Sequence, residues 1–438
     1  MAADVQGKVG ARVRLCGWVD SVTDHQDRRS VVLRDRTGTA VLLVGADAGG
    51  GADPAPRREA AIEVTGTVVA DGAPDAEGNG GADGPGASGV AVLVEELVES
   101  GAVAADLPVG AGSPLEQRLD WRFLDLRRPR NLLVFEVQTT AERAMREYWA
   151  EHGFLELHSP KLRPNPNRTG RELFSVPYFD RQAYLVQSPQ FYKQMAMAAG
   201  FERVFEIGPV FRANPTATNR HDTEFTSVDV EISWVDSDED VMGFEERWLR
   251  HVIGAVRAAH GDEIAERFGV EVNVPEVPFP RVPLEAARRI AEASGPDLAQ
   301  PPGDLDAAGE RALGRHVARV RGHDFVFVTE YPEATRPFYH MRTEPGSPLT
   351  RGFDLLWKGM EVTTGSQREH RYDVLVRQAE EHGVPLDPIR YYLDCFRFGC
   401  PPHGGFGLGL TRMLMSLLEE DDVRKVTFLH RGPDRLSP

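Results

Sequence analysis

The chain has 438 residues, of which 41% are hydrophobic and 27% are charged, as expected for a globular protein with room for two or three domains. Its net charge of −17 is unlike that of a non-specific nucleic-acid binder, although a local basic patch could still bind RNA. The 3 cysteines form no paired Cys-x-x-Cys, which disfavours a disulfide framework or a four-cysteine zinc site. Neither a signal peptide nor a membrane span of roughly 20 apolar residues is visible, so we expect a cytoplasmic protein with no membrane partner.

The N-terminal part has the pattern of a β domain. Short runs of apolar and β-branched residues predict strands at 11–19, 30–35, 39–45, 61–69 and 90–98. Two stretches rich in Gly, Ala and Asp, near 46–57 and 71–88, predict surface loops between them. Five short strands in about ninety residues suit an OB-like barrel, a fold that often binds oligonucleotides, and a barrel without a ligand is the alternative. We therefore predict an OB-like β-barrel domain over residues 1–100.

A second domain is predicted to follow a linker. Residues 101–116 are mostly small and form the expected linker, and residues 117–438 form the second domain. Apolar residues recur at helical spacing over 132–152, and a strand-like run then ends at Pro160.

Further along the second domain, strands and helices do not alternate as βαβ units. Runs at 204–212 and 224–232 predict two strands joined by a polar loop, with Arg212 at its mouth. Helices are predicted at 238–260, 283–294 and 371–383, and a strand at 324–332; a glycine-rich turn enters a last helix at Arg412. This order favours an α+β fold with an antiparallel sheet. Arg212 at the mouth of the loop and Arg412 far downstream form a pair of phosphate-type arginines, and no Walker-type phosphate loop is present. This pairing suggests ATP held by arginines on an antiparallel sheet.

Five segments resemble the class II aminoacyl-tRNA synthetases, and within them the aspartyl-tRNA synthetases of archaeal and eukaryal type. They are WRFLDLRRP (121–129), QSPQFYKQ (187–194), FEIGPVFRA (205–213), RGFDLLWKGMEVTTGSQREHRYD (351–373) and PPHGGFGLGL (401–410). The resemblance spans nearly the whole chain. It implies the antiparallel catalytic sheet of class II synthetases, ATP and Mg²⁺ as cofactors, aspartate and tRNA as substrates, and a homodimer formed through the 132–152 helix and Pro160.

The resemblance also implies roles around ATP. Arg212 would contact the α-phosphate and the aminoacyl carboxylate, Arg412 would hold the γ-phosphate, and both are the expected catalytic residues. Phe225 would stack on adenine, and Glu361 with Thr364 would hold Mg²⁺ through oxygen atoms. The implied ATP-binding set is Arg212, Asn214, Arg220, His221, Phe225, Glu361, Gly407, Gly409 and Arg412.

For the amino acid, the resemblance implies a clamp of two cations. Lys193 and Arg368 would hold a side-chain carboxylate, and this arrangement favours aspartate over asparagine because a neutral amide leaves positive charge uncompensated. The implied substrate-binding set is Arg168, Ser188, Gln190, Lys193, Asp229, Thr364 and Arg368, of which Ser188, Gln190 and Asp229 would hold the α-ammonium.

Several positions depart from the family pattern. Arg168 stands in a loop where relatives usually have a glutamate that closes on the ammonium, and Asn214 replaces a glutamate that accepts from adenine. Thr411 replaces the glutamate of the last motif. In the barrel, Ser30 and Val41 stand where an aromatic residue and a glutamine usually read the anticodon, a loss of about 1–3 kcal/mol for each contact.

These departures leave three interpretations open. The first is an aspartate–tRNA ligase that forms aspartyl-adenylate and transfers the acyl group to tRNA. The second is a diverged synthetase that adenylates aspartate or a related acid and passes it to a non-tRNA acceptor, or that serves as a resistance copy. The third is a non-catalytic RNA-binding paralogue, against which the retained Arg212, Phe225, Glu361, Arg368 and Arg412 argue.

Overall fold

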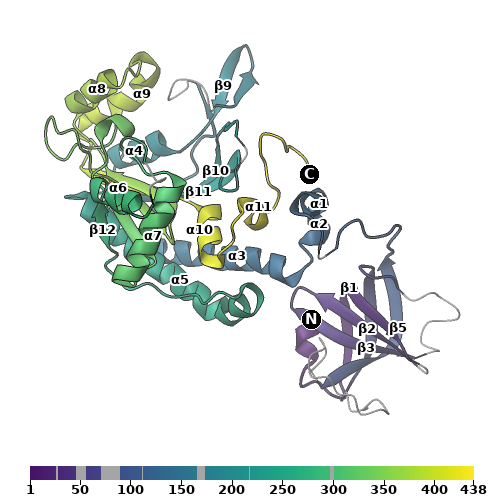
Figure 1. Ribbon diagram of the computed structural model, residues 1–438. Helices are drawn as coiled ribbons and strands as arrows, with labels where there is room; N and C mark the ends of the chain where they lie inside the picture. Colours follow the sequence, from purple (N-terminus) through teal and green to yellow (C-terminus); the bar gives the residue numbers. More distant parts are fainter. Residues whose placement is uncertain are drawn as a thin grey trace. The chain divides into compact units, whose positions relative to one another are not determined.

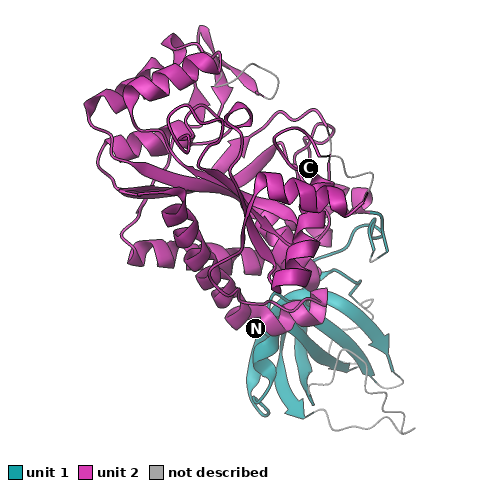
Figure 2. Cartoon of the chain, turned by 60° about the vertical axis from the view of Figure 1, so that its left-hand side comes forward, with its two compact units in different colours: residues 1–114 teal, residues 115–438 magenta. Residues whose placement is uncertain are grey.

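The protein divides into two compact units, Met1–Pro114 and Leu115–Pro438 (Figure 2). The computed structural model describes residues 1–25, 28–45, 56–70, 89–110, 112–164, 173–216, 218–295 and 300–438. Most of the two stretches expected as barrel loops, and Arg168, lie outside these residues. Among the helices that the structure describes, none is long and apolar enough to cross a membrane.

The first unit is a closed five-stranded barrel, which agrees with the OB-like prediction (Figure 1). Its strands follow the order β1-β2-β3-β5-β4, in which β3 and β5 pair in parallel. Alternate apolar side chains, including Val19, Leu33 and Leu42, point inward and are fully buried. The elements are the 3₁₀ helix η1 (Ala2–Val5), β1 (Arg12–Asp24), β2 (Arg28–Asp35), β3 (Gly38–Gly45), β4 (Ala61–Ala70) and β5 (Val90–Gly101).

The second unit is built on an eight-stranded, mainly antiparallel sheet, so the α+β prediction is confirmed (Figure 1). The strand order is β12-β13-β14-β15-β16-β11-β10-β6. The strands are β6 (Leu155–Glu156), β10 (Arg203–Phe211), β11 (Glu224–Ser233), β12 (Arg281–Pro283), β13 (Phe325–Thr329), β14 (Gly352–Trp357), β15 (Met360–Gln367) and β16 (His403–Gly409). A separate small sheet has the order β7-β9-β8 and contains β7 (Leu162–Arg163), β8 (Ser175–Tyr178) and β9 (Arg181–Leu185).

Two long helices cover the core of this sheet. They are α3 (Pro129–Glu151) and α5 (Asp238–Phe268). Trp149 of α3 stacks between Phe205 of the sheet and Trp248 of α5, with ring centroids 4.3 and 5.1 Å away. Stacked aromatic rings of this size bury much apolar surface and fix the helices on the sheet.

The remaining helices are shorter. They are α1 (Leu115–Asp120), α2 (Arg122–Asp125), α4 (Gln190–Ala198), α6 (Leu284–Ala293), α7 (Ala307–Arg321), η2 (Glu333–Thr335), α8 (Tyr372–Glu381), η3 (Asp387–Ile389), α9 (Arg390–Leu393), η4 (Asp394–Phe398), α10 (Leu410–Leu418) and α11 (Val423–Val426). Helix α7 was not predicted, although Asp306 caps its first turn by accepting from the backbone N–H groups of Ala308 and Gly309.

The glycine-rich run before Arg412 is a strand and not the predicted turn. Residues 403–409 form β16 at the centre of the sheet, between β11 and β15. Glycine is needed there because a Cβ at Gly405 would collide with the Val230 carbonyl and the Glu231 carboxylate. The strand-like run ending at Pro160 is also shorter than predicted, since β6 covers two residues.

Glu245 is a buried carboxylate in α5 that makes stability depend on pH. Its Oε1 accepts a hydrogen bond from Thr363 Oγ1 at 2.6 Å, and burial raises its pKa from 4.5 to about 8. The folded state therefore keeps a proton that the unfolded state loses, so its contribution to stability is full below pH 4.5 and is lost as pH rises to about 8. The stability of Glu245→Gln relative to wild type, measured as the free energy of unfolding, is expected to be about 3–4 kcal/mol higher at pH 8 than at pH 5.

Urea unfolding at the two pH values measures this difference. Glu266→Gln, an exposed position on the same helix, is the matched control and should behave alike at both. An equal effect of Glu245→Gln at pH 5 and pH 8 would show that Glu245 does not titrate in this range.

Candidate active site

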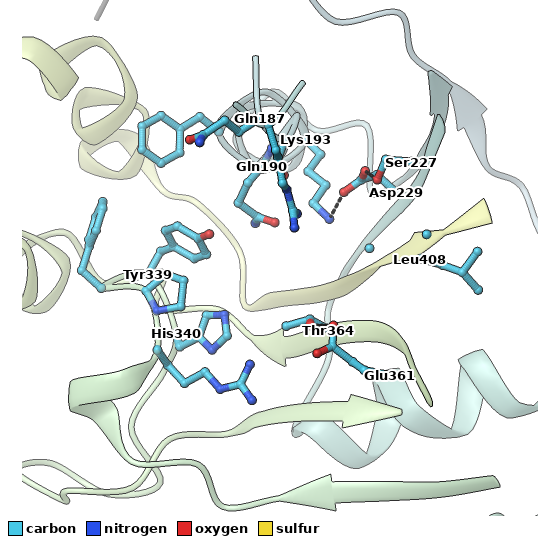
Figure 3. A pocket seen from close by; sticks show the side chains of 18 of the residues that line it. Gln187, Gln190, Lys193, Ser227, Asp229, Tyr339, His340, Glu361, Thr364 and Leu408 are labelled. Carbon is cyan, nitrogen blue, oxygen red and sulfur yellow. Dashed lines mark hydrogen bonds and ion pairs between the residues drawn. The ribbon is translucent and has the colours of Figure 1, made fainter. Parts of the chain in front are cut away.

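One cavity of about 940 Å³ in the second unit brings the predicted site residues together (Figure 3). Fifteen of them line it, from β11, β15, β16, α4, α10 and the loops beside these elements. They are Ser188, Gln190, Lys193, Arg212, Asn214, Arg220, His221, Phe225, Asp229, Glu361, Thr364, Arg368, Gly407, Gly409 and Arg412. Arg168 lies outside the described residues. The clustering is a geometric result, and the individual roles stay predictions.

Arg212 lies where the β10–β11 pair opens into a loop. Its backbone N–H donates to Thr223 O at 2.8 Å, which fixes the mouth of the loop. The guanidinium lies 5.2 Å from the centre of the Phe225 ring, within cation–π range. The Asn214 side chain turns into its own loop, because Oδ1 accepts from the Thr216 N–H at 3.1 Å. Asn214 is therefore already engaged in a local turn where an adenine contact was expected.

His221, Arg412 and Glu361 form a chain of contacts along the cavity. Arg412 Nη2 lies 3.1 Å from His221 Nε2, and its Nη1 lies 3.3 Å from Glu361 Oε1. Because arginine can only donate, His221 Nε2 accepts and Nδ1 carries the proton, which faces Thr218 Oγ1 at 2.6 Å. Burial, and then the charge of Arg412, lowers the pKa of His221 to about 4, which agrees with a neutral ring.

Glu361 and Thr364 are adjacent oxygen donors on β15. Thr364 Oγ1 donates to Glu361 Oε1 at 3.3 Å, so the hydroxyl and carboxylate face the same point. Burial and the nearby charge of Asp354 raise the pKa of Glu361. Mg²⁺ is commonly held by one or two protein oxygens together with phosphate oxygens, and this pair fits such a site.

Glu310 is a residue of this region that was not predicted from the sequence. It comes from the unpredicted helix α7, and its Oε2 lies 2.9 Å from Arg220 Nη1 and 3.4 Å from the Glu361 backbone nitrogen. Burial and the charge of Glu361 raise its pKa to about 7. Glu310 therefore ties the loop that carries Arg220 to β15. The aspartate that caps α7 was the signal that could have placed this helix.

At another part of the cavity, two buried cations meet two carboxylates. Lys193 Nζ lies 2.9 Å from Asp229 Oδ1 and 3.3 Å from Glu231 Oε2. Arg368 Nε donates to Glu231 Oε1 at 3.0 Å. All four side chains are almost fully buried. Glu231 was not predicted; the alternation Asp-x-Glu on β11, which places Asp229 and Glu231 on one face, was the available signal.

The remaining residues of the cavity in the predicted set are held by local hydrogen bonds or by close packing. Gln190 Nε2 donates to Gln194 Oε1 at 3.0 Å, and its backbone N–H donates to Ser188 Oγ at 3.3 Å. A Cβ at Gly407 would lie 3.2 Å from Asp229 Oδ1, whereas one at Gly409 would make ordinary contact with Arg412. Close approach therefore requires glycine at 407 more than at 409.

Comparison with known proteins agrees with this geometry. The family model of the class II tRNA synthetases (D, K and N) matches residues 114–431. An aspartate–tRNA(Asp/Asn) ligase of Methanopyrus kandleri is 42% identical over 98% of this chain and 96% of its own length. An aspartate–tRNA(Asp) ligase of Pyrococcus horikoshii is 36% identical over 98% of this chain and 97% of its own length.

A solved structure is also similar over nearly the full length. The asparaginyl-tRNA synthetase of Pyrococcus horikoshii, complexed with asparaginyl-adenylate, aligns with a TM-score of 0.88 and 31% identity, over 99% of this chain and 98% of that one. An antiparallel sheet with an arginine-rich cavity is thus the catalytic domain of a class II aminoacyl-tRNA synthetase. The chain belongs to the class II tRNA synthetases of the aspartate, lysine and asparagine group, which confirms the resemblance found in the sequence.

Proposed function

We propose that this protein is an aspartate–tRNA ligase that uses ATP and Mg²⁺. The observation that carries the proposal is that one cavity holds Arg212, Arg412 and Glu361 together with the cation pair Lys193 and Arg368. The first three suit a nucleoside triphosphate, and the pair suits a side-chain carboxylate. Full-length relatives named aspartate–tRNA ligases support the same assignment.

In the first step, the α-carboxylate of aspartate attacks the α-phosphorus of ATP, and pyrophosphate leaves. Arg212 stabilises the charge that develops on the α-phosphate, and Arg412, which donates to neutral His221, binds the leaving phosphates. Glu361 and Thr364 would hold Mg²⁺, which neutralises phosphate charge when it is bound. Phe225 offers a flat face for adenine beside Arg212.

In the second step, a ribose hydroxyl of the terminal adenosine of tRNA attacks the acyl carbon, and AMP leaves. Asp229, which accepts from Lys193 Nζ, would hold the α-ammonium of aspartate together with Ser188 and Gln190. No side-chain nucleophile is needed, because positioning and electrostatic stabilisation lower both barriers.

The barrel favours a second candidate, a synthetase that acylates something other than tRNA. Ser30, where an aromatic residue is expected, hydrogen-bonds His25 Nε2 at 3.1 Å through Oγ, and Val41 offers no hydrogen bond to a base. A barrel of this type would read an anticodon weakly.

The protein is also proposed to act as a cytoplasmic homodimer. Exposed Trp121, Phe123 and Phe428 support a subunit contact, and a monomeric mass in analytical ultracentrifugation would exclude it.

Two assays test the proposal in sequence. The purified chain is expected to catalyse aspartate-dependent exchange between pyrophosphate and ATP, and then to charge total tRNA with aspartate. Strong exchange without charging would favour the second candidate. Absence of exchange with a panel of amino acids would leave the non-catalytic interpretation.

A further inference from the structure

The guanidinium of Arg368 has most of its hydrogen-bond donors already in use. Arginine has five N–H donors and no acceptor. Nε donates to Glu231 Oε1 at 3.0 Å, and Nη2 donates to Gly405 O at 2.8 Å. Nη1 contacts both Ser366 Oγ at 2.7 Å and His340 Nε2 at 3.2 Å. Four of the five donors thus have protein partners within the part of the chain that the structure describes, and the fifth belongs to Nη2.

His340 is held firmly against Arg368. The two residues form a backbone β-bridge, and the His340 side chain is buried and lines the cavity. Its backbone N–H donates to Pro337 O at 3.0 Å, and its carbonyl accepts from Gln378 Nε2 at 3.1 Å. The ring packs on Gly352, where a Cβ would lie 2.9 Å from Nδ1. This backbone anchoring and packing hold the ring beside Arg368 Nη1.

The contact limits what Arg368 can offer to a ligand. An arginine binds a carboxylate most strongly through two parallel N–H bonds, one from each terminal nitrogen. Since Ser366 and His340 take both hydrogens of Nη1, the protein leaves one donor on Nη2. A carboxamide oxygen needs one donor, whereas a carboxylate loses half of its preferred fork.

The neighbouring lysine does not restore a strong preference for negative charge. Lys193 is already paired with Asp229 and Glu231, so two cations and two carboxylates balance in this part of the cavity. Discrimination between a carboxylate and a carboxamide therefore depends on which N–H groups remain available, more than on net charge.

We propose that His340 is a specificity-determining residue that occupies one N–H of Arg368 and thereby lowers the preference of this site for a side-chain carboxylate over a carboxamide. This inference rests on the proposed function, because it assigns Arg368 to the amino-acid side chain. His340 acts through Arg368 and is a positioning residue.

The test compares aspartate with asparagine in ATP–pyrophosphate exchange. His340→Ala frees one N–H of Arg368 Nη1 and is expected to raise the ratio of kcat/KM for aspartate to that for asparagine by about tenfold. His340→Gln keeps an acceptor for Nη1 and should leave the ratio within about twofold of wild type. The KM for ATP should not change in either variant, which separates the effect from general damage to the cavity.

The outcomes distinguish the inference from the function on which it rests. If wild type exchanges with neither amino acid, both the proposed function and the inference fail. If wild type activates aspartate but the ratio in His340→Ala is unchanged or falls, the inference alone is wrong. If His340→Ala loses its native melting transition, His340→Leu fills the ring's volume without an acceptor and gives the same test.

Discussion

Replacing Glu231 by glutamine is expected to lower the free energy of unfolding by about 3–5 kcal/mol. Glu231 is fully buried between Arg368, at 3.0 Å, and Lys193, at 3.3 Å. Burial by itself raises the pKa of Glu231, but the charges of Arg368 and Lys193 outweigh it and hold the pKa below its usual value. The carboxylate is therefore charged at neutral pH, and its removal leaves buried positive charge with too little compensation.

The pH dependence of stability gives a second test of the role of Glu231. Folding lowers the pKa of Glu231. Its contribution to the free energy of unfolding is therefore full above the pKa of the unfolded state and is lost as pH falls through the pKa of the folded state. Urea unfolding at neutral pH should thus show the full loss of stability in Glu231→Gln. In acid, the difference in the free energy of unfolding between this variant and wild type should become smaller. Glu224→Gln, exposed on the same strand, is the control and should stay within about 0.5 kcal/mol of wild type. A loss below about 1 kcal/mol in Glu231→Gln would mean that Asp229 alone compensates the two cations.

The sequence predicted the site best where polar residues lie at the ends of strands with a clear alternation of apolar residues. The runs at 204–212 and 224–232 predicted β10 and β11 closely, and with them Arg212, because alternating β-branched residues define both strands. The same pattern predicted the barrel. It could not give Glu310, because the buried face of α7 is mostly glycine and alanine with one leucine and one valine, which gives a weak apolar pattern.

Contacts made across the sheet were also beyond sequence patterns. The assignment of residues 403–409 as a turn followed from glycine's usual role, whereas the structure uses glycine so that β16 can pass close to Glu231 and Val230. His340 and Arg368 are 28 residues apart in sequence, and only the bridge between their segments brings them together. Periodicity fixes which face a residue occupies, but pairings between distant segments depend on strand order.

Most of the cations that line the cavity are already partnered by the protein. Arg412 contacts Glu361 and His221, Arg220 contacts Glu310, and Lys193 contacts Asp229. Such pairing keeps the side chains in place before substrate binds, which reduces the entropy that binding must overcome. It also means that ATP phosphates must compete with protein carboxylates, so Mg²⁺ at Glu361 would help to release Arg412 for the phosphates.

Arg212→Ala is expected to lower kcat/KM for ATP–pyrophosphate exchange with aspartate by about a thousandfold. The guanidinium lies at the mouth of the β10–β11 loop and beside Phe225, where the α-phosphate and the adenine would meet. Arg212→Lys keeps the charge but loses the planar fork, so a loss of about a hundredfold is expected from it. Steady-state exchange rates measure both variants.

The other end of the same strand provides the control for Arg212. Arg203 begins β10, is exposed, and donates to the His152 carbonyl at 2.9 Å. Arg203→Ala removes the same kind of side chain at the opposite end of β10, yet it should leave exchange within about threefold of wild type, because Arg203 lies at the end of β10 away from the cavity. If Arg212→Ala and Arg203→Ala lose activity equally, Arg212 acts on folding of the strand pair. If Arg212→Lys is as active as wild type, a single positive charge is enough for activity at this position. The hypothesis that a planar guanidinium positions the α-phosphate in line would then be wrong.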